Sequence, residues 1–265
     1  MTATETTFTE PRVFTITCTA RAGVDIADLD ALAAAVTIAA GAVGVAFCRG
    51  PSGAVRGAAP AKRPPQHSFG RQITMGVRCA SQPERDVHVK LFGNGTLQIA
   101  GCLRADAGYE AAELTCAACG FVAPPVDLVV RMINCGFRAS HRLNLAACVG
   151  AARGAGLMAT YDPCCYSALK LSLFFGLGGD AVPACRCATH CATKKPSNRL
   201  CRMVVVSLFE SGAIGVSGAT TQDHVRRAGD VVRDLVRRCP GARQLADDEV
   251  LVRLRQLAGA SETAA

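Results

Sequence analysis

The stretch KLFGNGTLQIAGC at residues 90–102 returns in related form as SLFESGAIGVSGA at residues 207–219. Both stretches contain the pattern LF-x-x-G-x-[LI]-x-[VI]-x-G, and the second lies 117 residues after the first. The same offset pairs Val13 with Val130 and Cys18 with Cys135. One offset that holds at both ends of a segment indicates an internal duplication. The alternative is two unrelated hairpins in a chain rich in alanine and valine.

Each half of the chain has the same predicted order of elements: a strand, a helix, four strands and a second helix. The pattern predicts an α+β fold with one antiparallel sheet and helices on one face. The first repeat spans 12–120, the second spans 124–239, and 240–265 form a C-terminal extension in which 240–258 add a short helix. Loops rich in Pro and Gly are expected at 50–68 and 176–200. The predicted strands are 12–20, 42–49, 71–80, 86–92, 95–101, 126–138, 156–162, 167–175, 201–209 and 213–218, and the predicted helices are 26–39, 106–119, 141–154 and 220–238.

The alternation of side chains along these strands separates a core face from an open face. Apolar residues such as Val89 and Leu171 belong to the core face. The residues between them are small, polar or basic, such as Thr74, Lys90 and Gly215. We therefore expect helices on one face of the sheet and a flat partner on the other.

Composition excludes several classes of protein. Half of the 265 residues are hydrophobic, which suffices for a large core, and the net charge is +8. No apolar stretch free of charges and breakers reaches the ~20 residues that a membrane span needs, so no membrane contact is expected. The Thr-rich, acidic N-terminus does not resemble a signal peptide. The 15 cysteines are therefore expected to be free thiols or metal ligands in a reducing, intracellular compartment.

The repeated motif and the order of elements resemble the TATA-box-binding protein family. YDPCCYSAL at 161–169 resembles the family's strand entry, and VVVSLFESGAIGVSGA at 204–219 resembles its Phe-containing hairpin. The first repeat is more divergent, as in the TATA-binding-protein-like proteins of large DNA viruses. The resemblance implies a curved, saddle-shaped antiparallel sheet with helices on its convex face.

The resemblance also implies a function in transcription initiation. The concave sheet would bind A·T-rich double-stranded DNA in the minor groove, and the protein would recruit a general transcription factor or viral RNA polymerase subunits. It would act as a monomer, in the host nucleus or in a cytoplasmic viral factory. The alternative is a scaffold of the same fold that has lost sequence-specific DNA reading and acts through protein contacts. A third class, the substrate-binding module of a nucleic-acid enzyme, would need a catalytic domain.

Family members bend DNA by wedging aromatic side chains between base steps. By resemblance, Phe92 and Phe209 are one member of each wedge pair, and Phe69 and Tyr166 are the others; the alternative for each is hairpin or strand packing. Val13 and Leu128 stand where the family has groove-reading Asn residues, which leaves A·T preference through DNA shape and nonspecific binding as alternatives. Further side chains expected to face phosphates or groove edges are Arg71, Arg78, Lys90, Gln98, Lys170 and Ser217.

Two further groups of residues carry predictions. The last helix has an apolar stripe, and its arginines are expected to bind an acidic protein partner; the alternative is a solvated basic face. The cluster Cys185-x-Cys187-x2-His190-Cys191 offers four soft ligands to Zn²⁺, the only cofactor that the sequence suggests, or it consists of free thiols. Cys116 and Cys119 are expected in the core. The arginines of the last helix that are expected to bind the partner are Arg226, Arg227, Arg233, Arg237 and Arg238.

No nucleophile–base order or phosphate-binding loop is present in the sequence, so we expect that the protein is not an enzyme.

Overall fold

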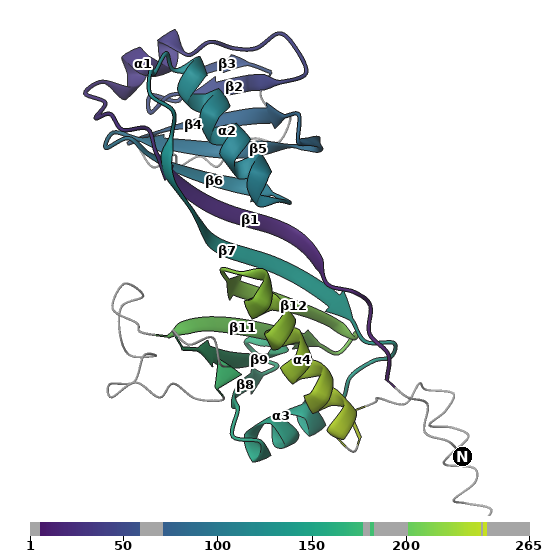
Figure 1. Ribbon diagram of the computed structural model, residues 1–265. Helices are drawn as coiled ribbons and strands as arrows, with labels where there is room; N and C mark the ends of the chain where they lie inside the picture. The colour runs from purple at the N-terminus through teal and green to yellow at the C-terminus, as the bar shows by residue number, and fades with distance from the viewer. Residues whose placement is uncertain (1–5, 59–70, 177–180, 183–200, 240, 243–265) are drawn as a thin grey trace, which may run out of the picture. The chain divides into compact units, whose positions relative to one another are not determined.

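The computed structural model describes residues 6–58, 71–176, 181–182, 201–239 and 241–242 (Figure 1). The chain forms two compact units. The amino-terminal unit contains Val13–Cys135 and Gly218–Gln222. The carboxy-terminal unit contains Gly136–Ser217, Asp223–Ala265 and the N-terminal residues Met1–Arg12.

The amino-terminal unit is an antiparallel sheet with two helices on one face (Figure 1). Its strands follow the order β3-β2-β4-β5-β6-β1-β7. The helix α2 packs across β2, β4, β5 and β6. The elements are β1 (Arg12–Arg21), α1 (Leu29–Ala35), β2 (Gly44–Arg49), β3 (Val55–Gly57), β4 (Gln72–Cys79), β5 (Gln82–Phe92), β6 (Thr96–Cys102), α2 (Ala105–Ala118) and most of β7 (Val126–Arg138).

The carboxy-terminal unit has the strand order β10-β9-β11-β12, and β8 pairs with β9 on the side opposite β11, which it shares with β10. The helix α3 packs on β8 and β9. The long helix α4 buries an apolar stripe that includes Val225, Ala228, Val232 and Leu235, as its 3.6-residue spacing predicts. The elements are α3 (Leu145–Gly154), β8 (Met158–Asp162), β9 (Tyr166–Phe175), β10 (Ala181–Val182), β11 (Arg202–Phe209), β12 (Ala213–Ala219) and α4 (Gln222–Arg238).

The core lies between each sheet and its helices, on the face that strand alternation predicts. The side chains predicted for the core are fully or nearly fully buried, while most of their neighbours along each strand stay partly or fully exposed; the buried exceptions are Gln72, Gly76, Ala168 and Phe174. Small side chains from the helices fill the space above the sheet, because the chain has no Trp and few aromatic residues. The core strand residues are Ile73, Met75, Val77, Cys79, Val87, Val89, Leu91, Leu97, Ile99, Leu169, Leu171, Leu173, Ile214 and Val216.

Two sequence predictions of the elements were wrong in detail. The first helix is much shorter than the predicted 26–39: Asp28 caps it by accepting hydrogen bonds from the amides of Asp30 and Ala31 at 2.9 Å. It ends because Val36 is extended and β-branched residues follow. Within the described residues, each half also contains five strands between its helices instead of the four predicted, because β3 and β10 lie within the predicted loops.

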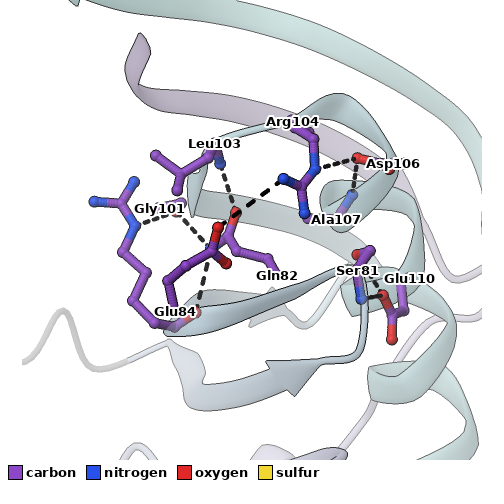
Figure 2. Close-up of polar contacts among 10 residues, drawn as sticks. Ser81, Gln82, Glu84, Gly101, Leu103, Arg104, Asp106, Ala107 and Glu110 are labelled. Atoms are coloured by element: carbon purple, nitrogen blue, oxygen red, sulfur yellow. Dashed lines mark hydrogen bonds and ion pairs between the residues drawn. The ribbon is translucent and has the colours of Figure 1, made fainter. Parts of the chain in front are cut away.

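Polar contacts fasten the turn between β4 and β5 to α2 (Figure 2). The carboxylate of Glu110 accepts hydrogen bonds from the amides of Ala80 and Ser81, at 2.6 and 2.9 Å, and from the Ser81 hydroxyl. Although burial opposes it, this set of donors holds the pKa of Glu110 below its usual value. The buried Gln82 side chain accepts from the Leu103 amide at 2.6 Å and donates to the Gly101 carbonyl at 3.1 Å.

The two repeated hairpins turn through glycines that no other residue can replace without strain. Gly95 has φ +70°, and a Cβ there would lie 2.1 Å from the Val24 carbonyl oxygen. Gly212 has φ +82°, and its Cβ would lie 2.5 Å from the His141 carbonyl oxygen. Their own carbonyls accept from the amides of Ala22 and Ala139 at 2.8 and 2.9 Å. The repeated motif therefore has a steric cause at the same position of both hairpins.

The duplication, the repeat boundaries at 12–120 and 124–239 and the saddle shape remain predictions from the sequence. In the part of the chain that the structure describes, no helix is both long and apolar enough to cross a membrane.

We predict that Gly95→Ala and Gly212→Ala each lower the free energy of unfolding by about 1–3 kcal/mol, the cost of a strained left-handed residue, or more where the clash is not relieved. Gly93→Ala is the matched control, because its Cβ would meet only the Ile26 carbonyl at an ordinary 3.5 Å. Urea unfolding followed by circular dichroism measures the difference. A control variant as unstable as the other two would refute this explanation of the motif.

Candidate nucleic-acid interface

In the carboxy-terminal unit the structure brings together the two residues predicted as one wedge pair. The rings of Tyr166 and Phe209 meet edge to face, with centroids 6.2 Å apart and planes at 67°. Tyr166 begins β9 and is 44% exposed, and Phe209 ends β11 directly before the hairpin turn. The ammonium of Lys170 lies 4.2 Å from the centre of the Tyr166 ring. An aromatic pair and a cation therefore share one end of the open face of this sheet.

In the amino-terminal unit Phe92 has the corresponding place at the end of β5, before the turn at Gly93–Gly95. It pairs across the ladder with Gln72 and lines an open hollow of about 710 Å³ together with Arg71, Asn94 and Asp28. Its predicted partner Phe69 lies outside the described residues, so the pair in this unit stays a prediction.

A row of polar side chains crosses the open face of the amino-terminal unit. Thr74, Lys90, Gln98 and Thr19 are successive cross-strand partners on β4, β5, β6 and β1. On β7, the Arg131 guanidinium donates to the Thr19 hydroxyl at 2.7 Å. Strand residues at matching positions point to the same face of a sheet, so the row and Arg131 form a strip of donors that includes two cations, Lys90 and Arg131.

A corresponding row crosses the open face of the carboxy-terminal unit. It contains Thr160, Lys170, Ser207 and Gly215, on β8, β9, β11 and β12. Both rows contain one lysine among uncharged residues, which are Thr and Gln in the first row and Thr, Ser and Gly in the second. Ser217 lies farther along β12, is exposed, and donates to the Val205 carbonyl at 3.4 Å. Such a surface offers hydrogen-bond donors and has few large side chains that project from it, which suits a flat ligand.

The two predicted arginines of the amino-terminal unit lie at opposite ends of β4. Arg71 precedes the strand, is exposed, and belongs to the hollow beside Phe92. Arg78 donates to the Gly41 carbonyl at 3.2 Å and lies 3.8 Å from the Asp86 carboxylate. The charge of Arg78 is therefore partly compensated within the protein, whereas Arg71 remains directed to solvent.

One aromatic residue on the open face was missed from the sequence. The Phe47 ring lies over Gly76, where a Cβ would be 2.2 Å from the ring, and its centroid is 6.2 Å from that of His88. These side chains border a hollow of about 340 Å³ with Asp86 and Arg85. A bulge between Val45 and Phe47 reverses the alternation of β2, and the sequence gives no sign of it.

The arginines of α4 are engaged within the protein. Arg226 and Arg227 pair with Asp223, and Arg233 pairs with Asp230, all one turn away on the same helix. Arg238 lies 2.7 Å from the carboxylate of Asp234, and Arg237 covers the Phe8 ring at 5.5 Å. Ion pairs at i,i+3 and i,i+4 account for much of this basic face. Binding of an acidic partner by these arginines stays a prediction.

The described cysteines are free thiols, and most are buried. Burial raises the pKa of Cys48 to about 11 and, together with nearby acidic groups, that of Cys79 to about 12. Cys116 is buried as expected, and Cys119 is half-buried. Within the described residues no group of three or more His, Cys, Asp or Glu side chains is arranged to hold a metal. The predicted zinc ligands Cys185, Cys187, His190 and Cys191 lie outside those residues, so the zinc site stays a prediction.

We predict that iodoacetamide labels Cys164 and Cys165 well before Cys48, Cys79 and Cys148 in the folded protein near pH 8. The first two are exposed, whereas burial keeps the other three protonated and covered. Site-resolved mass spectrometry over time measures the order, and labelling in urea provides the control in which the difference disappears. Labelling of Cys79 or Cys148 as fast as Cys164 under native conditions would contradict this.

Comparison with known proteins identifies the fold. No family model and no curated protein matches the sequence. Among solved structures, the chain is similar to the TBP of Methanococcus jannaschii, with a TM-score of 0.52 and 14% sequence identity. The match covers 88% of this chain and 100% of the archaeal chain. At this identity the similarity concerns the fold, which is that of the TATA-box-binding proteins.

Proposed function

We propose that this protein is a non-enzymatic DNA-binding transcription factor that lays the open faces of its sheet on the minor groove of duplex DNA. The single observation that supports this most is the contact between Tyr166 and Phe209 at the hairpin end of an open face, within a TBP-like fold. The structure brings these two sequence-distant aromatic residues into contact, and we take them as the counterparts of the wedge pair that the resemblance implies.

The physical requirement for a minor-groove wedge is an apolar ring at the rim of a flat surface. Separating two stacked bases costs a few kcal/mol per step, which the inserted ring and the wrapped protein surface offset. Tyr166 and Phe209 together present such an edge, and the Tyr hydroxyl remains able to meet solvent because the residue is exposed. Lys170 beside the ring supplies a cation for a neighbouring phosphate.

The polar rows support contact with a groove floor. Minor-groove edges of A·T pairs present only acceptors, at adenine N3 and thymine O2. Thr19, Thr74 and Gln98 supply donors in one row of the amino-terminal unit, and Thr160 and Ser207 do so in the row of the other unit. We expect recognition of A·T-rich DNA through groove shape, because Val13 and Leu128 stand where the resemblance places the groove-reading Asn residues.

We predict that the double variant Phe92→Ala and Phe209→Ala binds an A·T-rich duplex about tenfold more weakly or worse and bends it less, since the offset to unstacking is lost. Fluorescence anisotropy measures affinity, and energy transfer between labelled duplex ends measures the bend. Tyr109→Ala is the control, because it removes an exposed aromatic ring from α2, on the helical side of the sheet. Wild-type bending by the double variant would refute the wedge assignment.

We predict that Lys90→Gln and Lys170→Gln each reduce the slope of log K against log salt by about 0.9, the value for one lost phosphate contact. Arg153→Gln on α3 is the control, because it removes an exposed charge from the helical side. A salt titration of duplex binding provides the slopes. If the control lowers the slope as much as Lys90→Gln does, the open face is not the phosphate-binding surface.

The second candidate, a scaffold of this fold that acts through proteins alone, is supported by the internal compensation of charge at Arg78 and on α4. The same titration separates the two functions. Binding that is absent or unchanged between low and high salt would favour the scaffold.

A further inference from the structure

The N-terminal residues 6–10 form a strap that pairs with residues 138–140 in the carboxy-terminal unit (Figure 1). The Thr9 amide donates to the Arg138 carbonyl at 2.9 Å, and the Ser140 amide donates to the Thr7 carbonyl at 3.0 Å. The Arg138 amide donates to the Thr9 hydroxyl at 2.9 Å. Phe8 is the antiparallel partner of Ala139. The strap thus pairs, as a short extended segment, with the residues at the end of β7 and directly after it.

The other side of residues 138–140 is occupied by the repeated hairpin turn. The Ala139 amide donates to the Gly212 carbonyl at 2.9 Å, and the Arg138 guanidinium donates to the Ser211 carbonyl at 2.7 Å. Without the strap, one row of backbone donors and acceptors at 138–140 would be open. An open edge of this kind pairs readily with another extended segment.

The strap places one large side chain, that of Phe8, between an aromatic ring and an arginine. The Phe8 ring contacts the buried Phe137 ring edge to face, with centroids 6.2 Å apart. The guanidinium of Arg237 lies 5.5 Å from the centre of the Phe8 ring, and that of Arg233 lies 4.9 Å from the centre of the Phe137 ring. Thr7 and Thr9 are exposed on either side. The strap is therefore held by its backbone and by one aromatic ring between an aromatic and a cationic partner.

We propose that residues 138–140, with Phe137 and Arg237, form a docking site for an extended protein segment that has an aromatic residue between small β-forming residues, and that the strap is its built-in occupant. Backbone pairing provides affinity and the ring position provides selectivity, as in other cases of strand addition. The basic side chains Arg138 and Arg237 favour acidic flanks, such as Glu10 of the strap itself. The proposal does not depend on DNA binding.

The test uses a labelled peptide with the sequence of residues 3–11 as the probe, and the variant that lacks residues 1–10 as the receptor. We expect the peptide to bind this variant, and to bind the full chain about tenfold more weakly because the tethered strap competes for the same edge. A peptide with Phe8→Ala should lose about tenfold in affinity, the sum of a ring pair and a cation–ring contact. Equal binding of both peptides, equal binding to both receptors, or no binding to a folded receptor would overturn the proposal.

A variant of the full chain keeps the test decisive if the truncated protein does not fold. Phe8→Ala should bind the peptide more tightly than the wild-type chain does and should accelerate hydrogen exchange of the Arg138 and Ser140 amides. Thr7→Ala is the control, because Thr7 contacts the edge only through its backbone. Unchanged exchange and peptide binding in Phe8→Ala would overturn the proposal. Dimers that form through exchanged straps, detected by sedimentation, would identify a second copy as the occupant instead and would equally refute a partner segment.

Discussion

The tight closure of two hairpins through glycines of positive φ is the constraint on which the rest of the structure depends. Gly95 and Gly212 let each turn approach another backbone segment so closely that a side chain would overlap it. The hairpins then fix where β5 and β11 end, and so where Phe92 and Phe209 stand. Both aromatic residues lie at the rim of an open face because each precedes a turn that cannot be widened.

The open faces owe their character to the helices on the other side. Since α2 and α4 bury only the apolar half of each alternating strand, the remaining half is free to be small and polar. Lys90 and Lys170 are the lysines of the central rows, among Thr, Gln, Ser and Gly residues. Burial of apolar area would contribute little to the binding free energy of such a surface. It is suited to a flat, charged ligand that presents hydrogen-bond acceptors. That chemistry, together with a TBP-like fold, favours duplex DNA over a protein partner.

The turn at Gly212 joins two surfaces of the carboxy-terminal unit. One side of the hairpin ends in Phe209, which contacts Tyr166 on the open face. The turn itself pairs with residues 138–140, whose other edge holds the N-terminal strap. A segment that replaced the strap would therefore pair with an edge that is hydrogen-bonded to the hairpin proposed to enter DNA.

Periodicity and the repeated motif predicted most strands and the core face, because these follow from alternation and from a repeated turn. The pairing of Tyr166 with Phe209 was expected only from the family resemblance. The intrahelical pairs of α4 were not predicted, although Asp223, Asp230 and Asp234 stand three or four positions from arginines and so mark them in the sequence. The position of Phe47 could not be predicted, because a bulge reverses the alternation of side chains along β2. The strap could not be predicted either, since its partners are more than a hundred residues away and no local pattern marks them.

The most direct test of the central claim is binding to duplexes in which A·T pairs are replaced by inosine·cytosine pairs. These pairs resemble A·T in the minor groove, where no exocyclic amine is present, and resemble G·C in the major groove. If the open faces lie on the minor groove, affinity for the inosine·cytosine duplex should stay close to that for the A·T duplex and fall for G·C. Affinity for the inosine·cytosine duplex as low as for G·C, or no binding to any duplex, would contradict the account.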